Sequence, residues 1–141
     1  MDQNKEDELY LDIARRVSKE SNCKRKQVGA VAVINSYTHN SSIISTALNG
    51  TPSGFDNCCE DENGETKIET LHAESNLLSK LSRSGNSTQG ATVYLTLSPC
   101  MECSKLLYQA GVKKIVYIEN YRNLDGLEFL KKAKIKVVQK S

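Results

Sequence analysis

Apolar and polar residues follow two different periods along the first third of the chain. Over residues 5–20 the apolar residues recur every four positions, which predicts an amphipathic helix. Two shorter apolar runs follow at 28–35 and 42–49, joined by the polar turn SYTHN. Short apolar runs bounded by polar residues are typical of strands, so we expect one helix followed by two paired strands.

The second half of the chain alternates between apolar runs and amphipathic segments. We expect strands at 91–97, 113–119 and 136–139, and helices over 72–83, 100–111 and 123–133. Strands that alternate with helices of this length predict an α/β layered fold. No linker, repeat or low-complexity segment interrupts the pattern, and 141 residues are enough for one core. We therefore expect a single domain that spans residues 1–141.

Residues 50–70 show neither period. They are rich in glycine, asparagine and acidic residues, and they separate the second strand from the next helix. A loop of this length inside a small domain is usually functional or mobile.

Charge and composition narrow the classes of function. The net charge is only +2 and Trp is absent, so we expect neither a dedicated nucleic-acid binder nor a base-stacking surface. We expect no signal peptide because the first ten residues are acidic and polar, and the longest apolar run, 28–34, is too short to span a membrane. These features predict a cytoplasmic protein, in the host cytoplasm if the source is a virus.

The cysteines are expected to stay reduced. There are five of them, and an odd number argues against a framework of disulfides. A chain that is not exported also stays in a reducing compartment. Reduced thiols are candidate metal ligands or nucleophiles.

Cys100 and Cys103 lie in the segment SPCMEC (98–103), directly after a predicted buried strand. Pro99 favours an extended residue before it and a clean helix start after it. The two thiols then share one face of the first helical turn, where the helix dipole favours thiolates. Three kinds of site fit: a redox dithiol, a structural zinc site with four protein ligands, and a catalytic zinc site with three.

His72 and Glu74 favour the catalytic zinc site. His72 starts the next predicted helix upstream and can supply the third ligand, which leaves one position for water. At a helix start the backbone is not yet regular, so a carboxylate two residues later can face the same cavity. It is placed to move the protons of a water that zinc makes acidic. H-x-E followed by P-C-x-x-C is the signature of zinc nucleobase deaminases, with the glutamate as general acid and base.

The chain resembles the cytidine and deoxycytidylate deaminase superfamily, and within it the deoxycytidylate (dCMP) deaminases, including bacteriophage forms. The resemblance runs from about residue 9 to residue 130 and includes SNCKRKQVGAV (21–31), NGTPSG (49–54), LTLSPCMEC and QAGVKKIVYIENYR (109–122). It implies a three-layer α/β/α fold with a five-stranded mixed sheet and both zinc motifs at helix N-termini. It also implies hydrolytic deamination of dCMP to dUMP and ammonia, with dCTP as an additional substrate.

The resemblance assigns roles to individual residues. Zn²⁺ would be held by His72, Cys100 and Cys103, with Glu74 protonating N3 of the ring and then the leaving amine. The backbone N–H of Ala73 would meet the ring O2, and the backbone carbonyl of Ser98 would hold the exocyclic amine. The sugar and phosphate would be contacted by Asn49, Arg25, Tyr121 and Arg122.

Many relatives also carry an auxiliary cysteine cluster. Its third position, just before the His-x-Glu motif, is Ile68 in this chain, so the cluster is incomplete. The resemblance still offers a second, structural zinc site from Cys23, Cys58, Cys59 and Glu69. Relatives often have Arg at position 69, and the glutamate here alters any site for an anionic ligand at that position.

The family also implies partners. Its members form homo-hexamers and are often regulated by dCTP with Mg²⁺ and by dTTP, so we expect a homo-oligomer and no polynucleotide partner. A transfer-RNA adenosine deaminase is a second hypothesis, but those enzymes typically read Glu-Pro-Cys where this chain has Ser98-Pro99-Cys100. A non-catalytic zinc module is a third, but it would favour a fourth protein ligand. His39, in the polar turn, is expected to be exposed and without a metal role.

Overall fold

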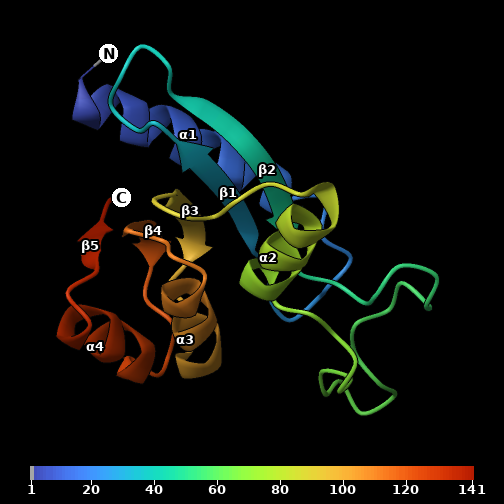
Figure 1. The fold of residues 1–141 in the computed structure, drawn as a ribbon. Coiled ribbons are helices and arrows are strands. Elements are labelled where there is room, and N and C mark those ends of the chain that lie inside the picture. Colours follow the sequence, from blue (N-terminus) through green and yellow to red (C-terminus); the bar gives the residue numbers. More distant parts are fainter. Residues whose placement is uncertain (1) are drawn as a thin grey trace.

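A mixed sheet runs through the centre of the molecule in the computed structural model, which describes residues 2–141 (Figure 1). Its strands are β1 (Gly29–Ile34), β2 (Ser42–Leu48), β3 (Thr92–Leu97), β4 (Lys114–Glu119) and β5 (Lys136–Gln139). They lie in the order β2-β1-β3-β4-β5. Strand β1 is antiparallel to both its neighbours, whereas β3, β4 and β5 are parallel. The five-stranded mixed sheet is as predicted.

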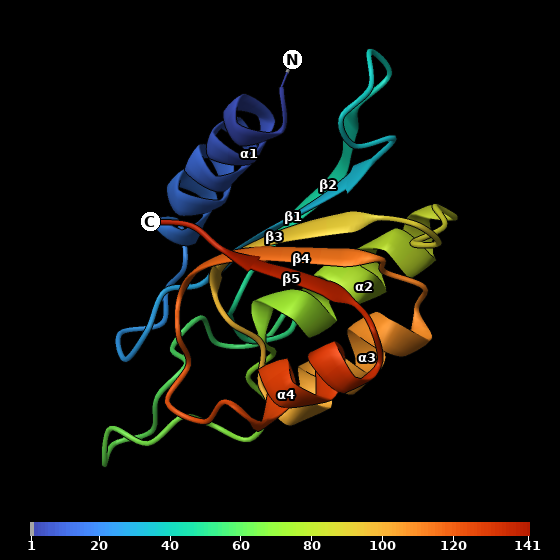
Figure 2. The same ribbon diagram turned by 90° about the vertical axis from the view of Figure 1, so that its left-hand side faces the viewer.

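Helices cover both faces of this sheet. Figure 2 shows α1 (Gln3–Ser18) alone on one face, and α2 (Ala73–Ser84), α3 (Met101–Gln109) and α4 (Asp125–Lys132) together on the other. Helices α3 and α4 connect parallel strands in the same direction across the sheet, and crossovers of one hand place both on one face. The result is the three-layer α/β/α arrangement that was expected.

Strand β1 shows how one strand serves both layers. Val31 and Val33 belong to the core under α1, while Ala30 and Ala32 belong to the core under the other helices. All four side chains are fully buried. Because alternate residues point to opposite faces, an almost continuous apolar run is what a strand between two helical layers requires.

A group of polar side chains is buried or half-buried on the α1 side. We call it the α1 polar cluster, and it consists of Asp7, Tyr37, Tyr94 and Lys114. Asp7 Oδ1 accepts hydrogen bonds from both tyrosine hydroxyls at 2.8 Å, and Lys114 Nζ donates to the Tyr37 hydroxyl. Burial, reinforced by Asp7, raises the pKa of each tyrosine above its usual value, and burial lowers the pKa of Lys114. The cluster joins α1 to the middle of the sheet.

The predicted helices and strands are all present, with ends within two residues of those expected. Helix α1 begins at Gln3 because the Asp2 side chain accepts a hydrogen bond from the Lys5 backbone and caps it. Residues 50–70 form no helix or strand, as expected, and are tied in place by isolated bridges. Residues 2–141 include no helix that is both long and apolar enough to cross a membrane.

One expectation about the cysteines is wrong. Cys23 and Cys59 form a disulfide, although all five thiols were expected to stay reduced. The long loop folds back against the segment before β1 and brings the two Cα atoms to 5.0 Å, which is a normal spacing for a disulfide. Cys58, Cys100 and Cys103 are free.

Candidate active site

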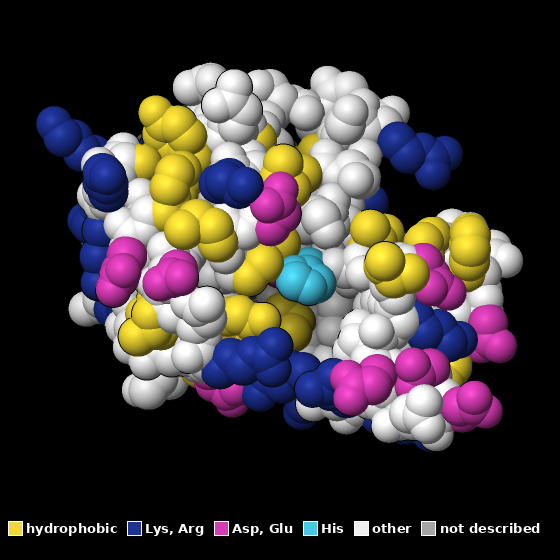
Figure 3. Space-filling model, turned by 90° about the horizontal axis from the view of Figure 1, so that it is seen from below, with side chains coloured by type: hydrophobic (Ala, Val, Ile, Leu, Met, Phe, Trp, Pro, Cys, Tyr) yellow, Lys and Arg dark blue, Asp and Glu magenta, His cyan; other side chains and the backbone are white. Residues whose placement is uncertain are grey.

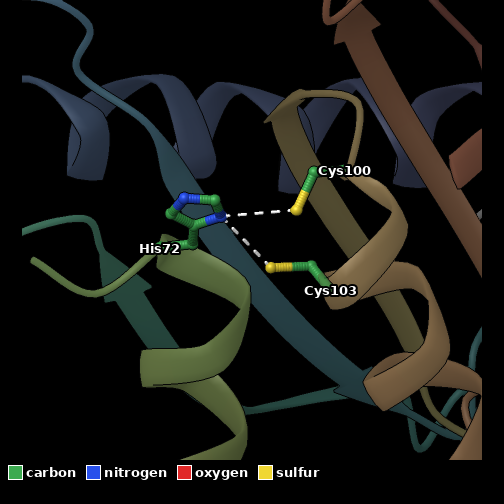
Figure 4. A group of neighbouring side chains, drawn as sticks. All are labelled: His72, Cys100 and Cys103. Atoms are coloured by element: carbon green, nitrogen blue, oxygen red, sulfur yellow. Dashed lines mark hydrogen bonds between the residues drawn. The ribbon is translucent and has the colours of Figure 1, made fainter. Parts of the chain in front are cut away.

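Three potential metal ligands meet where α2 and α3 begin. The Nδ1 atom of His72 lies 3.5 Å from Sγ of Cys100 and 3.3 Å from Sγ of Cys103 (Figure 4). Among the described residues, this is the one group of three or more His, Cys, Asp or Glu side chains close enough to share an ion. The predicted ligands are therefore brought together, although they come from segments almost thirty residues apart.

The local backbone explains why these side chains face each other. His72 and Cys100 are the N-cap residues of α2 and α3, and both have extended backbone geometry. Neither side chain caps its own helix, so each is free to turn toward the other helix. Cys103 lies one turn into α3 and completes the group from below.

Glu74 is also explained by the N-cap position of His72. Because His72 is extended and Glu74 is already the second residue of the helix, the pair does not follow helical angular spacing. The Glu74 side chain is 4% exposed. Burial raises its pKa to about 7, while its own backbone N–H and the charge of His72 act in the opposite direction. Two residues of one short segment thus reach the same site.

The two thiols differ electrostatically. A hydrogen bond with Cys103 lowers the pKa of Cys100 to about 4, and His72 acts in the same direction. The same hydrogen bond and burial raise the pKa of Cys103. The hydrogen bond with Cys100 raises the pKa of His72. The group therefore contains a ready thiolate beside an imidazole.

This donor set fits zinc. Zinc binds imidazole nitrogen at about 2.1 Å and thiolate sulfur at about 2.3 Å in tetrahedral sites, which separates the two donors by about 3.6 Å. The nitrogen–sulfur distances here are 3.3 and 3.5 Å. Two sulfurs and one nitrogen leave the fourth position to water, which is the arrangement of catalytic rather than structural zinc. A redox dithiol would not need the histidine.

The SPCMEC segment is held in place by contacts with strand β4 and helix α4. The Ser98 backbone N–H donates to the Glu119 carbonyl at 2.8 Å, so the end of β3 stays paired with β4. Gly126, in the first turn of α4, lies against the turn before α3. A Cβ there would lie 2.4 Å from the Pro99 carbonyl oxygen and 2.6 Å from Ser104 Oγ. Only glycine permits this approach.

A cavity of about 510 Å³ opens above the ligands. Its lining includes His72, Ala73, Glu74, Ser98 and Cys100. Three cationic side chains also line the cavity. They come from the segment before β1 (Arg25 and Lys26) and from the segment after β4 (Arg122). Figure 3 shows a face of the molecule on which a histidine lies in a hollow, with Lys and Arg side chains gathered beside it.

The predicted ring contacts lie in the cavity wall. The Ala73 backbone N–H and the Ser98 backbone carbonyl take part in no hydrogen bond among residues 2–141, so one donor and one acceptor are available. The Ser98 hydroxyl is occupied, because it accepts a hydrogen bond from the Tyr121 backbone at 2.7 Å. The backbone of this wall can thus pair with a flat polar ring.

The residues predicted to contact the sugar and the phosphate also line the cavity, but Asn49 is already engaged in hydrogen bonds with the backbone. Asn49 lines the cavity, but its side chain accepts from Val28 N at 2.9 Å and donates to Lys26 O at 2.7 Å. It therefore holds the neighbouring segment as well as facing the cavity. Arg122 extends over the Tyr121 ring, 5.5 Å from its centroid, and both residues line the cavity.

The predicted second zinc site is not assembled. Cys23 and Cys59 are joined to each other, and disulfide sulfurs are not thiolate ligands. Cys58 is exposed, and its thiol donates to the Glu60 carbonyl at 3.2 Å. Glu69 joins no cluster of potential ligands in the part of the chain that the structure describes. The described residues thus give no evidence for a second zinc site at these four positions.

Some cavity residues were missed at the sequence level. Lys26 pairs with Glu119 at 2.5 Å across the rim, and Glu60 lines the cavity although it lies deep in the acidic loop. Lys26 lies in a segment that the family resemblance covers, so that signal could have found it. Nothing in the sequence separates Glu60 from the other acids of its loop. His39 is exposed in the β1–β2 turn, as expected.

Comparisons with known proteins agree with this geometry. Residues 4–119 match the family described as the cytidine and deoxycytidylate deaminase zinc-binding region. The chain is 35% identical to the deoxycytidylate deaminase of Enterobacteria phage T4, over 90% of this chain and 86% of the relative. Similarity to transfer-RNA A34 deaminases, at 19% identity and a TM-score of 0.62, extends to the fold alone.

A solved structure matches over nearly the full length. It is the dCMP deaminase of cyanophage S-TIM5 in complex with dCMP and dUMP, with a TM-score of 0.90, 42% identity and 99% of each chain covered. Together with the family match over residues 4–119 and the His/Cys/Cys group beside a buried glutamate, this match fixes the family. The chain belongs to the cytidine and deoxycytidylate deaminase family.

Proposed function

We propose that this protein catalyses the hydrolytic deamination of dCMP to dUMP and ammonia. The observation that carries the proposal is one cavity that is lined by Glu74, by two members of the His/Cys/Cys group, and by cationic side chains. The phage relatives named above are dCMP deaminases, and one was solved with dCMP and dUMP. A nucleotide fits this cavity, because its base can lie beside Glu74 and the His/Cys/Cys group while its phosphate meets the cationic side chains.

His72, Cys100 and Cys103 would hold the zinc, which when bound supplies an acidic water beside the ring carbon that carries the amine. Glu74 is buried next to that position and takes the proton of the water. It passes this proton to N3 of the ring as the water oxygen bonds to C4. The remaining proton of the C4 hydroxyl then moves through Glu74 to the amine, and the C4–N bond breaks. The products are ammonia and the 4-oxo ring of dUMP, so atoms and charges balance.

The two unpaired backbone groups of the cavity wall orient the ring. The Ala73 N–H donates to the ring O2, and the Ser98 carbonyl accepts from the 4-amino group. A donor and an acceptor at these places match cytosine, whereas uracil presents no amine to the carbonyl. This arrangement favours release of the product.

The phosphate would lie between the cations of the rim. Arg25 comes from the segment before β1, and Arg122 comes from the segment after β4, next to Tyr121. Charge-assisted hydrogen bonds from arginine to phosphate are strong, and they would favour dCMP over deoxycytidine. Asn49 faces the sugar while it holds Lys26 and Val28 in place.

Self-association and effectors are part of the same proposal. Exposed apolar side chains lie on α3, among them Leu106 at 43% and Tyr108 at 45% exposure, and they support a homo-oligomer, for which the family suggests a hexamer. The family also suggests dCTP with Mg²⁺ as activator or further substrate, and dTTP as inhibitor. Light scattering and initial rates with each nucleotide test these points.

A substrate panel tests the assignment. Purified protein with one zinc per chain is given dCMP, dCTP, cytidine, deoxycytidine and a transfer-RNA hairpin, with and without dCTP and Mg²⁺. We expect dCMP to be converted to dUMP with the highest kcat/KM. Equal or faster turnover of cytidine or of the hairpin would contradict the proposal.

A further inference from the structure

The segment that carries Arg25 has no regular structure of its own. Residues 22–27 make no backbone-to-backbone hydrogen bond within the described chain, 2–141. Side chains hold the segment instead. Asn49 accepts from Val28 N and donates to Lys26 O, and the disulfide fixes Cys23 to Cys59. The position of Arg25 therefore depends on groups outside its own segment.

Glu60 holds the part of this segment nearest to Arg25. Its Oε2 atom accepts hydrogen bonds from two successive backbone N–H groups, Lys24 N at 3.0 Å and Arg25 N at 3.1 Å. Within residues 2–141, neither N–H makes another hydrogen bond. A carboxylate that takes two adjacent amides fixes the peptide plane between them, and a charged acceptor strengthens both bonds.

The Glu60 carboxylate is buried, and one of its two oxygens has no hydrogen-bond partner among the described residues. The residue is 8% exposed and lines the cavity, and the oxygen without a partner is Oε1. A buried carboxylate with an unpaired oxygen lowers the stability of the fold. A role at the cavity offers a reason for a charged residue at this place.

The Arg25 side chain depends strongly on this backbone support. Its own contacts are long: Nη1 lies 3.5 Å from Thr66 Oγ1 and 3.7 Å from Glu65 Oε2. The side chain is 49% exposed, so these contacts hold it weakly. The backbone at Arg25, and hence Glu60, decides where the guanidinium can reach.

We infer that Glu60 is a positioning residue for phosphate recognition: it fixes the Arg25 backbone so that the guanidinium meets the 5′-phosphate of the substrate. The inference rests on the proposed function, because it takes Arg25 as a phosphate contact. It adds that the selection of a nucleotide over a nucleoside depends on an acid that touches neither the phosphate nor the reacting ring. Among residues 2–141 the Glu60 carboxylate bonds only to Lys24 N and Arg25 N, and to none of the zinc ligands, so we expect the chemical step to be unaffected.

The test compares two substrates that differ only in the phosphate. For Glu60→Ala we expect KM for dCMP to rise about tenfold, the effect of losing a charged hydrogen bond, with kcat unchanged. The kcat/KM for deoxycytidine should stay within twofold of the unchanged protein. Glu60→Gln keeps an oxygen that accepts from the same N–H groups and should recover part of the loss. Glu62→Gln removes an exposed charge from the same loop and serves as the matched control.

A double-mutant cycle with Arg25→Ala separates the possible failures. If Glu60 acts through Arg25, Glu60→Ala should add no further rise in KM when Arg25 is already alanine. Zinc content and circular dichroism of each variant report whether it has folded. A KM rise in Arg25→Ala but not in Glu60→Ala overturns the positioning role alone.

Two other outcomes also contradict the inference. No change of KM in either variant overturns the phosphate role of Arg25 and the inference with it, while dCMP deamination itself stands. Additive effects in the double variant, or an equal loss for deoxycytidine, show that Glu60 supports the cavity as a whole. If Glu60→Ala does not fold, the Glu60→Gln cycle gives the same readout.

Discussion

The protein buries polar groups on both sides of its sheet, and the two sides use them differently. On the α1 side, no side-chain atom of Asp7, Tyr37, Tyr94 or Lys114 is buried without a partner. On the side of α2 and α3, the site keeps a buried glutamate with a raised pKa and two unpaired backbone groups in the cavity wall.

This difference separates a structural cluster from a functional one. Buried polar groups that satisfy each other stabilise a unique packing and leave nothing to offer a ligand. Buried polar groups that are left unpaired in the wall of a cavity lower stability but remain available to a ligand. Changes in the α1 polar cluster should therefore alter stability alone, and changes in the site should alter turnover alone.

The largest effect is expected at Glu74. Glu74→Gln should lower kcat for dCMP by about a thousandfold, because the amide cannot move protons. The free energy of unfolding should not fall, since a buried carboxylate is removed, and zinc should remain at one per chain by atomic absorption. Glu102→Gln, an exposed acid in the first turn of α3, is the matched control and should keep full activity. Loss of zinc in Glu74→Gln would mean that Glu74 is a ligand.

The next effect is expected at Asp7. Asp7→Ala should lower the free energy of unfolding by about 3 kcal/mol, because two tyrosine hydroxyls lose their buried acceptor. The value is measured by urea denaturation, and kcat should stay within twofold. Glu8→Ala changes an exposed carboxylate of the same helix and should cost almost nothing. A large fall in kcat at unchanged stability would erase the distinction between the two clusters.

A smaller effect is expected at Tyr94. Tyr94→Phe removes one hydroxyl from Asp7 but leaves the bond from Tyr37 in place, so we expect a loss of about 1 kcal/mol. Tyr108→Phe, at a tyrosine that is 45% exposed, should have no effect in the same urea experiment. A loss as large as that of Asp7→Ala would show that the cluster fails as a unit.

The smallest expected effect is a loss of stability at alkaline pH, where Tyr37 and Tyr94 begin to lose their protons. In the folded chain both pKa values are raised, by burial first and then by Asp7, so the folded state keeps protons that the unfolded chain releases above about pH 10. This contribution to stability is fully present below about pH 10 and is lost as the pH rises further. Urea midpoints between pH 8 and pH 11 measure it. The decline should be shallower in a Tyr37→Phe/Tyr94→Phe variant; equal slopes would contradict the assignment.

The sequence predicted the elements and the metal ligands because both leave local signals. Apolar periods define each helix and strand, and His72, Cys100 and Cys103 stand in short motifs whose spacing reflects helix starts. The meeting of the two motifs follows from the strand order. Such features depend on neighbours within a few positions of the chain.

The rest depends on contacts between distant segments. Cys23 and Cys59 are 36 residues apart, and their pairing depends on how an aperiodic loop folds back. Glu60 is one of several acids in that loop, and only its approach to Lys24 and Arg25 distinguishes it. Asn49 was predicted to face the sugar, but nothing in the sequence shows that its amide also holds residues 26–28.

Gly126 helps to fix the backbone that presents Cys100, although helix α4 supplies none of the three potential metal ligands. Helix α4 rests against the Pro99 carbonyl and Ser104 at a distance that a single methyl group would break. Any residue other than glycine must push α4 outward or displace the turn that presents Cys100. A substitution at Gly126 should therefore disturb the geometry of the predicted zinc ligands from a helix that supplies none of them.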